Sequence, residues 1–125
     1  MSSVAGLRGS AGLAGYCATK GGVRLFAKAV AMECAAAGDG IRINTVHPGV
    51  IDTPIWTKIP ASTGSNAPTI PTRWRKPKYR SAGLAKRETS QKGVLFLASD
   101  ASSYMTGGEL MIDGGMTGRA RPRWS

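Results

Sequence analysis

The sequence predicts an α/β protein in which helices alternate with the strands of a parallel sheet. Two features of its 125 residues carry this prediction: helical and strand-like segments follow each other in turn, and glycines close them. The length suits a single domain. The predicted elements are, in order, a helix over 12–37, a strand over 41–47, an irregular stretch over 52–92, a helix body over 93–100 and a strand over 109–113.

The first helix follows a glycine-rich segment, residues 4–15, which is predicted to be a loop along the floor of a site. Residues 12–37 are rich in Ala, Leu, Lys and Glu, and Gly38 and Gly40 end the pattern. The apolar positions predict a helix that is buried on much of its girth. These positions are Val23, Leu25, Phe26, Val30 and Met32.

The first strand is predicted from its β-branched residues over 41–47, and Pro48 and Gly49 end it. Residues 52–92 are rich in Pro, Ser, Thr, Lys and Arg, and they far exceed an ordinary connection. The second strand, 109–113, is short and lies between glycine pairs. A helix between two strands is the pattern of a parallel sheet.

The net charge of +10 is confined to two segments. Residues 73–92 contribute +7 and three arginines of the C-terminal tail contribute +3, so the rest of the chain is neutral. This distribution weakens the inference from a basic composition to a nucleic-acid partner. Binding of nucleic acid through Trp74 and Tyr79, which interleave with the basic residues, is therefore the least favoured function.

Several classes of protein do not fit this composition. No run approaches the ~20 apolar residues of a membrane span, and the charged leader and apolar core of a signal peptide are missing. Cys17 and Cys34 fall in one predicted helix and are expected to be free thiols in a reducing cytoplasm. With His47 as the lone histidine, no metal site is predicted, and His47 itself is assigned a structural role.

Tyr16 and Lys20 are the first candidates for chemistry, because a spacing of four residues at the start of a helix places both side chains on one face. A phenol is a poor base at neutral pH, with a reference pKa of ~10. A neighbouring ammonium favours the phenolate, so the pair could exchange a proton with an alcohol or carbonyl oxygen. By itself such a pair also arises by chance on a protein surface.

The surrounding motifs give the pair a context. Ser2-Ser3 precedes Tyr16, P-G-V-I-D-T at 48–53 follows a predicted strand, and L-F-L-A-S-D and I-D-G-G close the chain. In this order and spacing the motifs resemble the short-chain dehydrogenase/reductase family, over residues 1–72 and 93–118. The resemblance implies the C-terminal, catalytic part of a Rossmann-like, doubly wound parallel sheet that is incomplete in these 125 residues.

The resemblance also implies a reaction and the residues for it. Ser3 would hold the substrate oxygen, Tyr16 would be the general acid/base, and Lys20 would assist Tyr16 and bind the ribose of the cofactor. The implied cofactor-binding set is Tyr16, Lys20, Pro48, Gly49, Ile51 and Thr53. The implied reaction is reversible hydride transfer between a secondary alcohol and its ketone, with NAD or NADP as carrier.

Finer implications concern the substrate and the partners. The amino-acid sequences of Gly6–Gly9 and of the closing segment are most similar to those of family members that oxidise cyclic alcohols or hydroxysteroids. Residues 54–72 would cover the substrate. The family's N-terminal strand, its T-G-x-x-x-G-x-G turn and its N-N-A-G segment have no counterpart here, so Met1 is interpreted as an internal methionine. We therefore expect marginal stability, no activity of the chain alone, and a homo-oligomer or association with a full-length relative.

Residues 73–92 depart from the family's acidic turn before its last helix. Read one base out of frame, one permitted back-translation of this stretch gives P-L-A-E-A-Q-I-P-L-G-R-V-G-E-A-G-D-I-A-K and then rejoins the chain at Gly93. The hypothesis is that two compensating frame slips produced the basic stretch. The nucleotide sequence decides it: the hypothesis is wrong if no one-base shift there encodes G-R-V-G-E.

Overall fold

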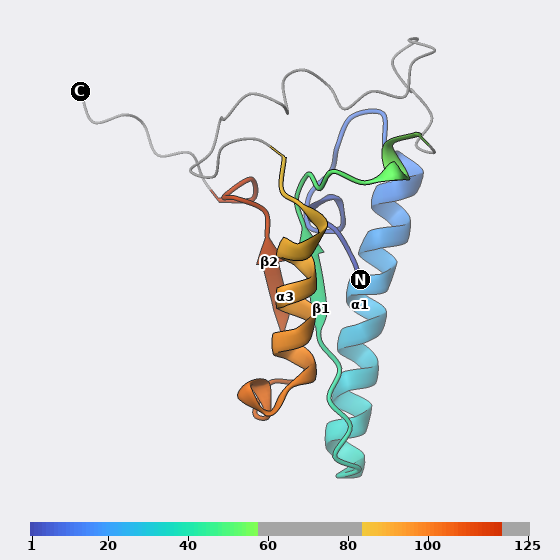
Figure 1. Ribbon diagram of the computed structural model, residues 1–125. Coiled ribbons are helices and arrows are strands. Elements are labelled where there is room, and N and C mark those ends of the chain that lie inside the picture. Colours follow the sequence, from blue (N-terminus) through green and yellow to red (C-terminus); the bar gives the residue numbers. More distant parts are fainter. Residues whose placement is uncertain (58–83, 119–125) are drawn as a thin grey trace, which may run out of the picture.

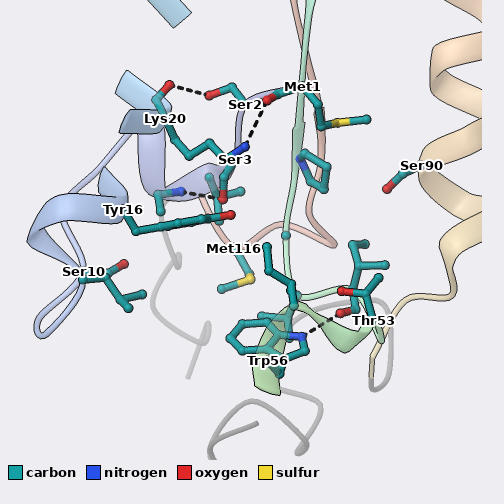
Figure 2. A pocket seen from close by; sticks show the side chains of 18 of the residues that line it. Met1, Ser2, Ser3, Ser10, Tyr16, Lys20, Thr53, Trp56, Ser90 and Met116 are labelled. Atoms are coloured by element: carbon teal, nitrogen blue, oxygen red, sulfur yellow. Dashed lines mark hydrogen bonds between the residues drawn. The ribbon is translucent and has the colours of Figure 1, made fainter. Parts of the chain in front are cut away.

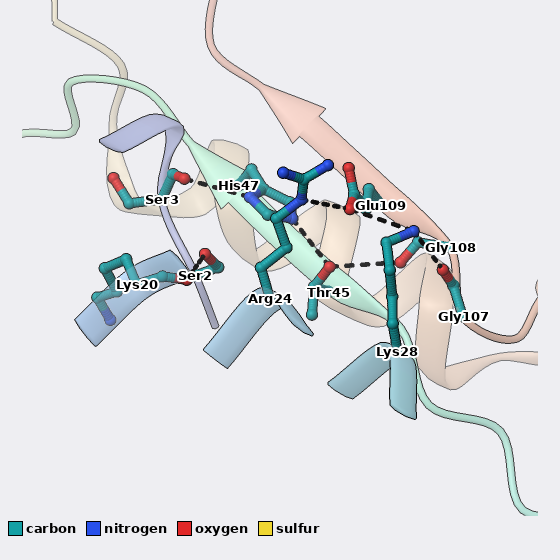
Figure 3. A network of polar contacts seen from close by, with 10 residues as sticks. All are labelled: Ser2, Ser3, Lys20, Arg24, Lys28, Thr45, His47, Gly107, Gly108 and Glu109. Carbon is teal, nitrogen blue, oxygen red and sulfur yellow. Dashed lines mark hydrogen bonds and ion pairs between the residues drawn. The ribbon is translucent and has the colours of Figure 1, made fainter. Parts of the chain in front are cut away.

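The computed structural model describes residues 1–57 and 84–118 (Figure 1). Its elements are, in order, the 3-10 helix η1 (Val4–Gly6), α1 (Ala14–Ala37), β1 (Thr45–Pro48), the 3-10 helix η2 (Pro54–Thr57), α3 (Arg87–Ala98), the 3-10 helix η3 (Asp100–Ser102) and β2 (Glu109–Ile112). The two strands are parallel, and α1 and α3 lie on opposite sides of them (Figures 1 and 3). The predicted α/β class with a parallel sheet is confirmed.

The N-terminal residues lie against the edge of β1 that does not pair with β2. Thr45 lies opposite Glu109 in the parallel register. On the other edge of β1, the Ser2 amide donates a hydrogen bond of 2.9 Å to the Val46 carbonyl. The N-terminal residues therefore run beside β1, which brings Ser3 to the same edge of the sheet as the carboxyl end of that strand.

β1 is shorter than the predicted strand, which was expected to begin at residue 41. Before Thr45 the chain bonds to the turn that precedes β2 rather than to a strand: the Gly107 amide donates to the Ile43 carbonyl at 2.7 Å, and the Asn44 amide group donates to the Met105 carbonyl at 2.8 Å. One main-chain and one side-chain hydrogen bond thus take the place of a regular ladder.

α1 ends where the sequence predicts, because Gly38 adopts a left-handed φ of 65° and its amide donates to the Cys34 carbonyl at 3.0 Å. The prediction that this helix is buried around much of its circumference is wrong. Ala31 is the one residue of α1 that is fully buried, while Phe26 is 72% and Met32 is 73% exposed. The short sheet covers only one face of so long a helix.

α3 begins at Arg87, six residues before the predicted helix body. The stretch 52–92 is accordingly not irregular throughout, since it also contains η2 and Ala85, which forms a parallel bridge with Ile51. Gly93 is buried where α3 crosses β2, and a Cβ there would overlap the Cδ1 atom of Ile112. The predictions for 58–83, including most of the substrate loop, and for the basic tail lie outside the described residues.

Arg42 fixes the C-terminal end of α3 to the segment that leads into β1. Its guanidinium donates to the main-chain carbonyls of Leu97 (3.1 Å), Ser99 (3.4 Å), Ser102 (2.9 Å) and Met105 (3.3 Å). A cation that satisfies the free carbonyls at the end of a helix stabilises that end. None of the helices in the described ranges has the length and apolar character that a membrane span requires.

Candidate active site

A cavity of about 290 Å³ opens where η1, the start of α1 and the carboxyl end of β1 meet (Figure 2). The carboxyl ends of parallel strands are where open α/β sheets place their ligands. All seven residues predicted for catalysis and cofactor binding line this cavity: Ser3, Tyr16, Lys20, Pro48, Gly49, Ile51 and Thr53. The structure thus brings the predicted set together, while the role of each residue stays a prediction.

Ser3 is the N-cap of η1, and its side chain is fixed by its own helix. Its extended backbone, with φ of −166° and ψ of 161°, turns the hydroxyl oxygen toward the Ala5 amide, which donates to it at 3.2 Å. Because that oxygen acts as acceptor, the hydroxyl hydrogen remains available to a group in the cavity.

Tyr16 and Lys20 lie on one face of α1, as their spacing predicts. The Lys20 Nζ atom is 5.7 Å from the centroid of the Tyr16 ring and donates to the Met1 carbonyl at 3.2 Å. The ammonium therefore lies between the Tyr16 ring and the N-terminal residues.

η1 and α1 touch at Gly6, and this contact sets the distance between Ser3 and the Tyr16–Lys20 pair. A Cβ at Gly6 would lie 2.6 Å from Ser2 Oγ and 2.7 Å from the main-chain carbon and oxygen of Lys20. The Ser2 hydroxyl also donates to the Lys20 carbonyl at 2.7 Å. Only glycine permits so close an approach of the two backbones.

The segment after β1 forms the other wall of the cavity. The bridge between Ile51 and Ala85 holds it in place through hydrogen bonds from the Asp52 amide to the Ala85 carbonyl (2.9 Å) and from the Ala85 amide to the Val50 carbonyl (3.2 Å). The indole nitrogen of Trp56 donates to the Ile51 carbonyl at 2.8 Å, which fixes the indole at the cavity edge (Figure 2).

Met116 reaches the cavity from the turn after β2, and this turn is built on one carboxylate. Asp113 accepts hydrogen bonds from the Gly115 amide (2.9 Å), the Thr117 amide (2.7 Å) and the Thr117 hydroxyl (2.5 Å). Burial raises the pKa of Asp113, but these hydrogen bonds outweigh it and hold the pKa below its ordinary value. The Arg8 guanidinium donates to the Met116 carbonyl at 2.8 Å and closes the loop.

Sequence reasoning missed three lining residues, Arg87, Ser90 and Met116, because no motif marks them as part of a site. The other apolar lining residues fall in segments that were predicted to border the site, namely 4–15, 48–53 and 54–72: Val4, Leu13, Val50, Ile55 and Trp56. Their wall is therefore suited to an apolar molecule. Within 1–57 and 84–118, no group of three or more His, Cys, Asp or Glu side chains could hold a metal ion.

The comparisons with known proteins decide the family. The sequence family described as enoyl-(acyl carrier protein) reductase matches residues 1–117. The chain belongs to the short-chain dehydrogenase/reductase family. This is an oxidoreductase family, and the expectation drawn from the motifs is confirmed at that level.

Individual short-chain dehydrogenases/reductases are also similar. Cyclopentanol dehydrogenase of Comamonas sp. (strain NCIMB 9872) is 44% identical over 117 residues, which are 94% of this chain and 44% of that enzyme. The 3-oxoacyl-[acyl-carrier-protein] reductase of Chlamydia trachomatis is 41% identical over 118 residues, or 93% and 43% of the two chains. The chain thus spans less than half the length of these relatives.

The fold is shared with this family as well. A Burkholderia xenovorans crystal structure assigned to the short-chain dehydrogenases/reductases superposes with a TM-score of 0.74 at 32% identity, over 96% of this chain and 43% of that one. The chain therefore has the fold of part of a Rossmann-like domain.

The cavity fits the reacting end of a nicotinamide nucleotide. Lys20 and Tyr16 supply an ammonium and a hydroxyl on one side, and Thr53 supplies a hydroxyl on the other (Figure 2). Ile51 also lines the cavity. Its volume of about 290 Å³ is just below the range of about 300–1,000 Å³ that is typical of ligand pockets.

Proposed function

We propose that this chain is the catalytic part of an NAD- or NADP-dependent oxidoreductase that interconverts a secondary alcohol and its ketone. Residues 1–125 would then belong to one NAD(P)-binding domain. The observation that carries the proposal is the meeting of Ser3, Tyr16 and Lys20 on one cavity at the carboxyl end of β1.

In this proposal each residue has a defined task. When it is bound, the nicotinamide supplies or accepts the hydride. The Ser3 hydroxyl, whose oxygen is held by the Ala5 amide, donates a hydrogen bond to the substrate oxygen. Tyr16 passes a proton to or from that oxygen, and the Lys20 ammonium stabilises the phenolate that results. The cofactor would lie against Pro48, Gly49, Ile51 and Thr53.

The substrate we propose is a secondary alcohol on a small ring. The apolar wall of Leu13, Val50, Trp56 and Met116 favours a hydrocarbon ring over a charged or extended molecule. The Comamonas relative, which is 44% identical, is a cyclopentanol dehydrogenase and supports the same class.

The direct test transplants the site into an intact relative. Residues 1–118 would replace the matching part of the Comamonas cyclopentanol dehydrogenase, and the chimera would be assayed with cyclopentanol and either NAD or NADP. We expect turnover that Tyr16→Phe lowers about 10²- to 10⁴-fold, the usual size of general acid/base catalysis. The matched control is Tyr104→Phe, because Tyr104 lies fully exposed on the surface. Equal activity of the two variants would refute the proposal.

The isolated chain needs its own measurement. We expect it to bind NADH and NADPH weakly, because the family's T-G-x-x-x-G-x-G turn, which receives the pyrophosphate, has no counterpart in these residues. Fluorescence titration of the purified chain, alongside its circular dichroism, measures this. Micromolar binding by a folded chain would show that these 125 residues already form a complete cofactor site.

A second candidate function is that of a non-catalytic subunit that associates with an intact family member. The observation that favours it is the set of large apolar side chains exposed on the helices, Leu25, Phe26 and Met32 on α1 and Leu95 on α3. Co-elution of the purified chain with purified cyclopentanol dehydrogenase, and its loss in Phe26→Glu, would support this function. Separate elution of the two proteins would exclude it.

A further inference from the structure

His47 is the most deeply buried side chain of the site region. It has no exposed surface and lies on β1, one residue before the turn that enters the cavity wall (Figure 3). A buried imidazole is tolerated only where its nitrogens find hydrogen-bond partners. It is also the one histidine in the sequence.

Both ring nitrogens have such partners, and the partners fix the tautomer. Nδ1 lies 3.2 Å from the main-chain carbonyl of Ser3, and Nε2 lies 2.9 Å from the Thr45 hydroxyl. A carbonyl can only accept, so Nδ1 must carry the hydrogen. In the neutral ring Nε2 then accepts from the hydroxyl of Thr45.

The bond from His47 completes the restraint of Ser3. The Ser3 carbonyl also accepts from the Gly6 amide at 2.9 Å, and its hydroxyl oxygen accepts from the Ala5 amide at 3.2 Å. The two bonds from Ala5 and Gly6 come from within η1 and would move with it. The bond from His47 comes from β1, 44 residues away, and together with the bond from the Ser2 amide to the Val46 carbonyl it holds η1 against the sheet.

The strand that carries His47 is in turn tied to the helix that carries Tyr16 and Lys20. Glu109, opposite Thr45 on β2, accepts from Arg24 Nε at 2.6 Å and lies 3.2 Å from Lys28 Nζ, both on α1 (Figure 3). Ser3 on one side and α1 on the other are therefore held to the same strand pair.

We propose that His47 is a positioning residue that places Ser3 relative to Tyr16 by donating from Nδ1 to the Ser3 carbonyl. Its importance for turnover depends on the function proposed above, whereas its hold on Ser3 does not. The alternative is a histidine that only fills the core. The two differ in which ring nitrogen matters, because filling the core needs the volume of the ring and positioning needs the donor at Nδ1.

Two amide substitutions separate these roles in the full chain. Asn places its amide nitrogen near the position of Nδ1, and Gln places its amide near Nε2. We therefore expect His47→Asn to keep the bond to Ser3 and His47→Gln to lose it. The readout is hydrogen exchange of the Ser2 amide, which bonds to the Val46 carbonyl of β1 at 2.9 Å, relative to that of the Gly49 amide, which bonds to Ile112 in the sheet at 2.9 Å. The ratio removes any change in global stability.

We expect this ratio to rise about tenfold in His47→Gln and to stay within about twofold of the wild type in His47→Asn. Equal ratios in the two variants would overturn the proposal, and so would a wild-type Ser2 amide that exchanges like that of an unstructured peptide. Nitrogen-15 labelling of the single histidine gives an independent check. A hydrogen on Nδ1 supports the proposal, and a hydrogen on Nε2 alone overturns it.

The chimera with cyclopentanol dehydrogenase separates this proposal from the proposed function. There we expect His47→Gln to lower kcat by about tenfold at unchanged KM for the cofactor, and His47→Asn to restore it. If Tyr16→Phe leaves turnover unchanged, the proposed function fails, while the exchange ratios still decide whether His47 holds Ser3.

Discussion

Replacing Gly6 with alanine tests how closely η1 must approach α1. The new Cβ would meet Ser2 Oγ at 2.6 Å and the main-chain carbon and oxygen of Lys20 at 2.7 Å. The Ser2 hydroxyl can rotate away if it gives up its hydrogen bond to Lys20. The Lys20 main chain cannot move away in the same manner, because it lies within α1. To bring the new Cβ to an ordinary contact distance of 3.4 Å from it, η1 must move by about 0.7 Å.

The expected effect follows from two losses and one gain. Overpacking against a rigid neighbour costs about 1–3 kcal/mol, and the lost hydrogen bond costs about 1 kcal/mol. Replacing glycine stiffens the unfolded chain and offsets about 0.4–1 kcal/mol of this. We therefore expect Gly6→Ala to lower the free energy of unfolding by about 2–3 kcal/mol, equivalent to about 8–12 °C in Tm for a domain of this size.

Urea and thermal denaturation followed by circular dichroism measure this change. The matched control is Gly9→Ala in the same segment, because a Cβ at Gly9 meets nothing within 4 Å. Gly22→Ala, in open space on α1, controls for the helix and should stabilise it by about 1 kcal/mol. A Gly6→Ala variant as stable as Gly9→Ala would refute the reasoning about the contact.

Two further predictions concern the ion pair and a buried hydroxyl. The hydrogen bond from Arg24 holds the pKa of Glu109 below its ordinary value of 4.5, so its stabilisation is complete above that pH and is lost as pH falls through the lower, folded value. Urea denaturation at several pH values should show that wild type has a higher free energy of unfolding than Glu109→Gln. We expect this difference to be constant near neutral pH and to disappear in acid. Among the described residues, the Ser90 hydroxyl is buried without a hydrogen-bond partner, so Ser90→Ala should raise the free energy of unfolding by about 1–2 kcal/mol. Its control, Ser99→Ala, removes a hydroxyl that donates to the Phe96 carbonyl at 2.8 Å and should lower it by about 1 kcal/mol.

Each of these two predictions has a clear contrary result. If the difference in free energy of unfolding between wild type and Glu109→Gln stays the same from about pH 7 to about pH 3, the ion pair does not cause the loss of stability in acid. Destabilisation by Ser90→Ala as large as that by Ser99→Ala would mean that the Ser90 hydroxyl has a partner. The out-of-frame reading of 73–92 has isoleucine at position 90, so an unpaired serine there agrees with that hypothesis, which the nucleotide sequence still has to test.

The predicted site residues came together because local spacing and motif order constrain them strongly. A spacing of four on a helix puts Tyr16 and Lys20 on one face whatever surrounds that helix. Pro48 and Gly49 end a strand, and the carboxyl ends of parallel strands share one edge of the sheet. These are short-range rules, and the residues that they concern line one cavity in the structure, while their roles stay a prediction.

Element boundaries and burial depend on contacts that local patterns do not contain. α3 begins at Arg87 because the chain there has just paired with Ile51, which is remote in sequence. Phe26 has the apolar character of a core residue, yet it is exposed because the described strands are too few to cover that face of α1.

The sequence by itself determined the α/β class, the family motifs and the seven residues that line one cavity. Only the tertiary structure decided what His47 and Arg42 do, since each acts on atoms more than 40 residues away: His47 on the Ser3 carbonyl and Arg42 on the Leu97 carbonyl. No periodicity or spacing in the chain encodes such a pairing. Such a pairing arises when folding buries a polar side chain and leaves it one set of hydrogen-bond partners. The burial of His47 and its hydrogen bond to Ser3 therefore form together.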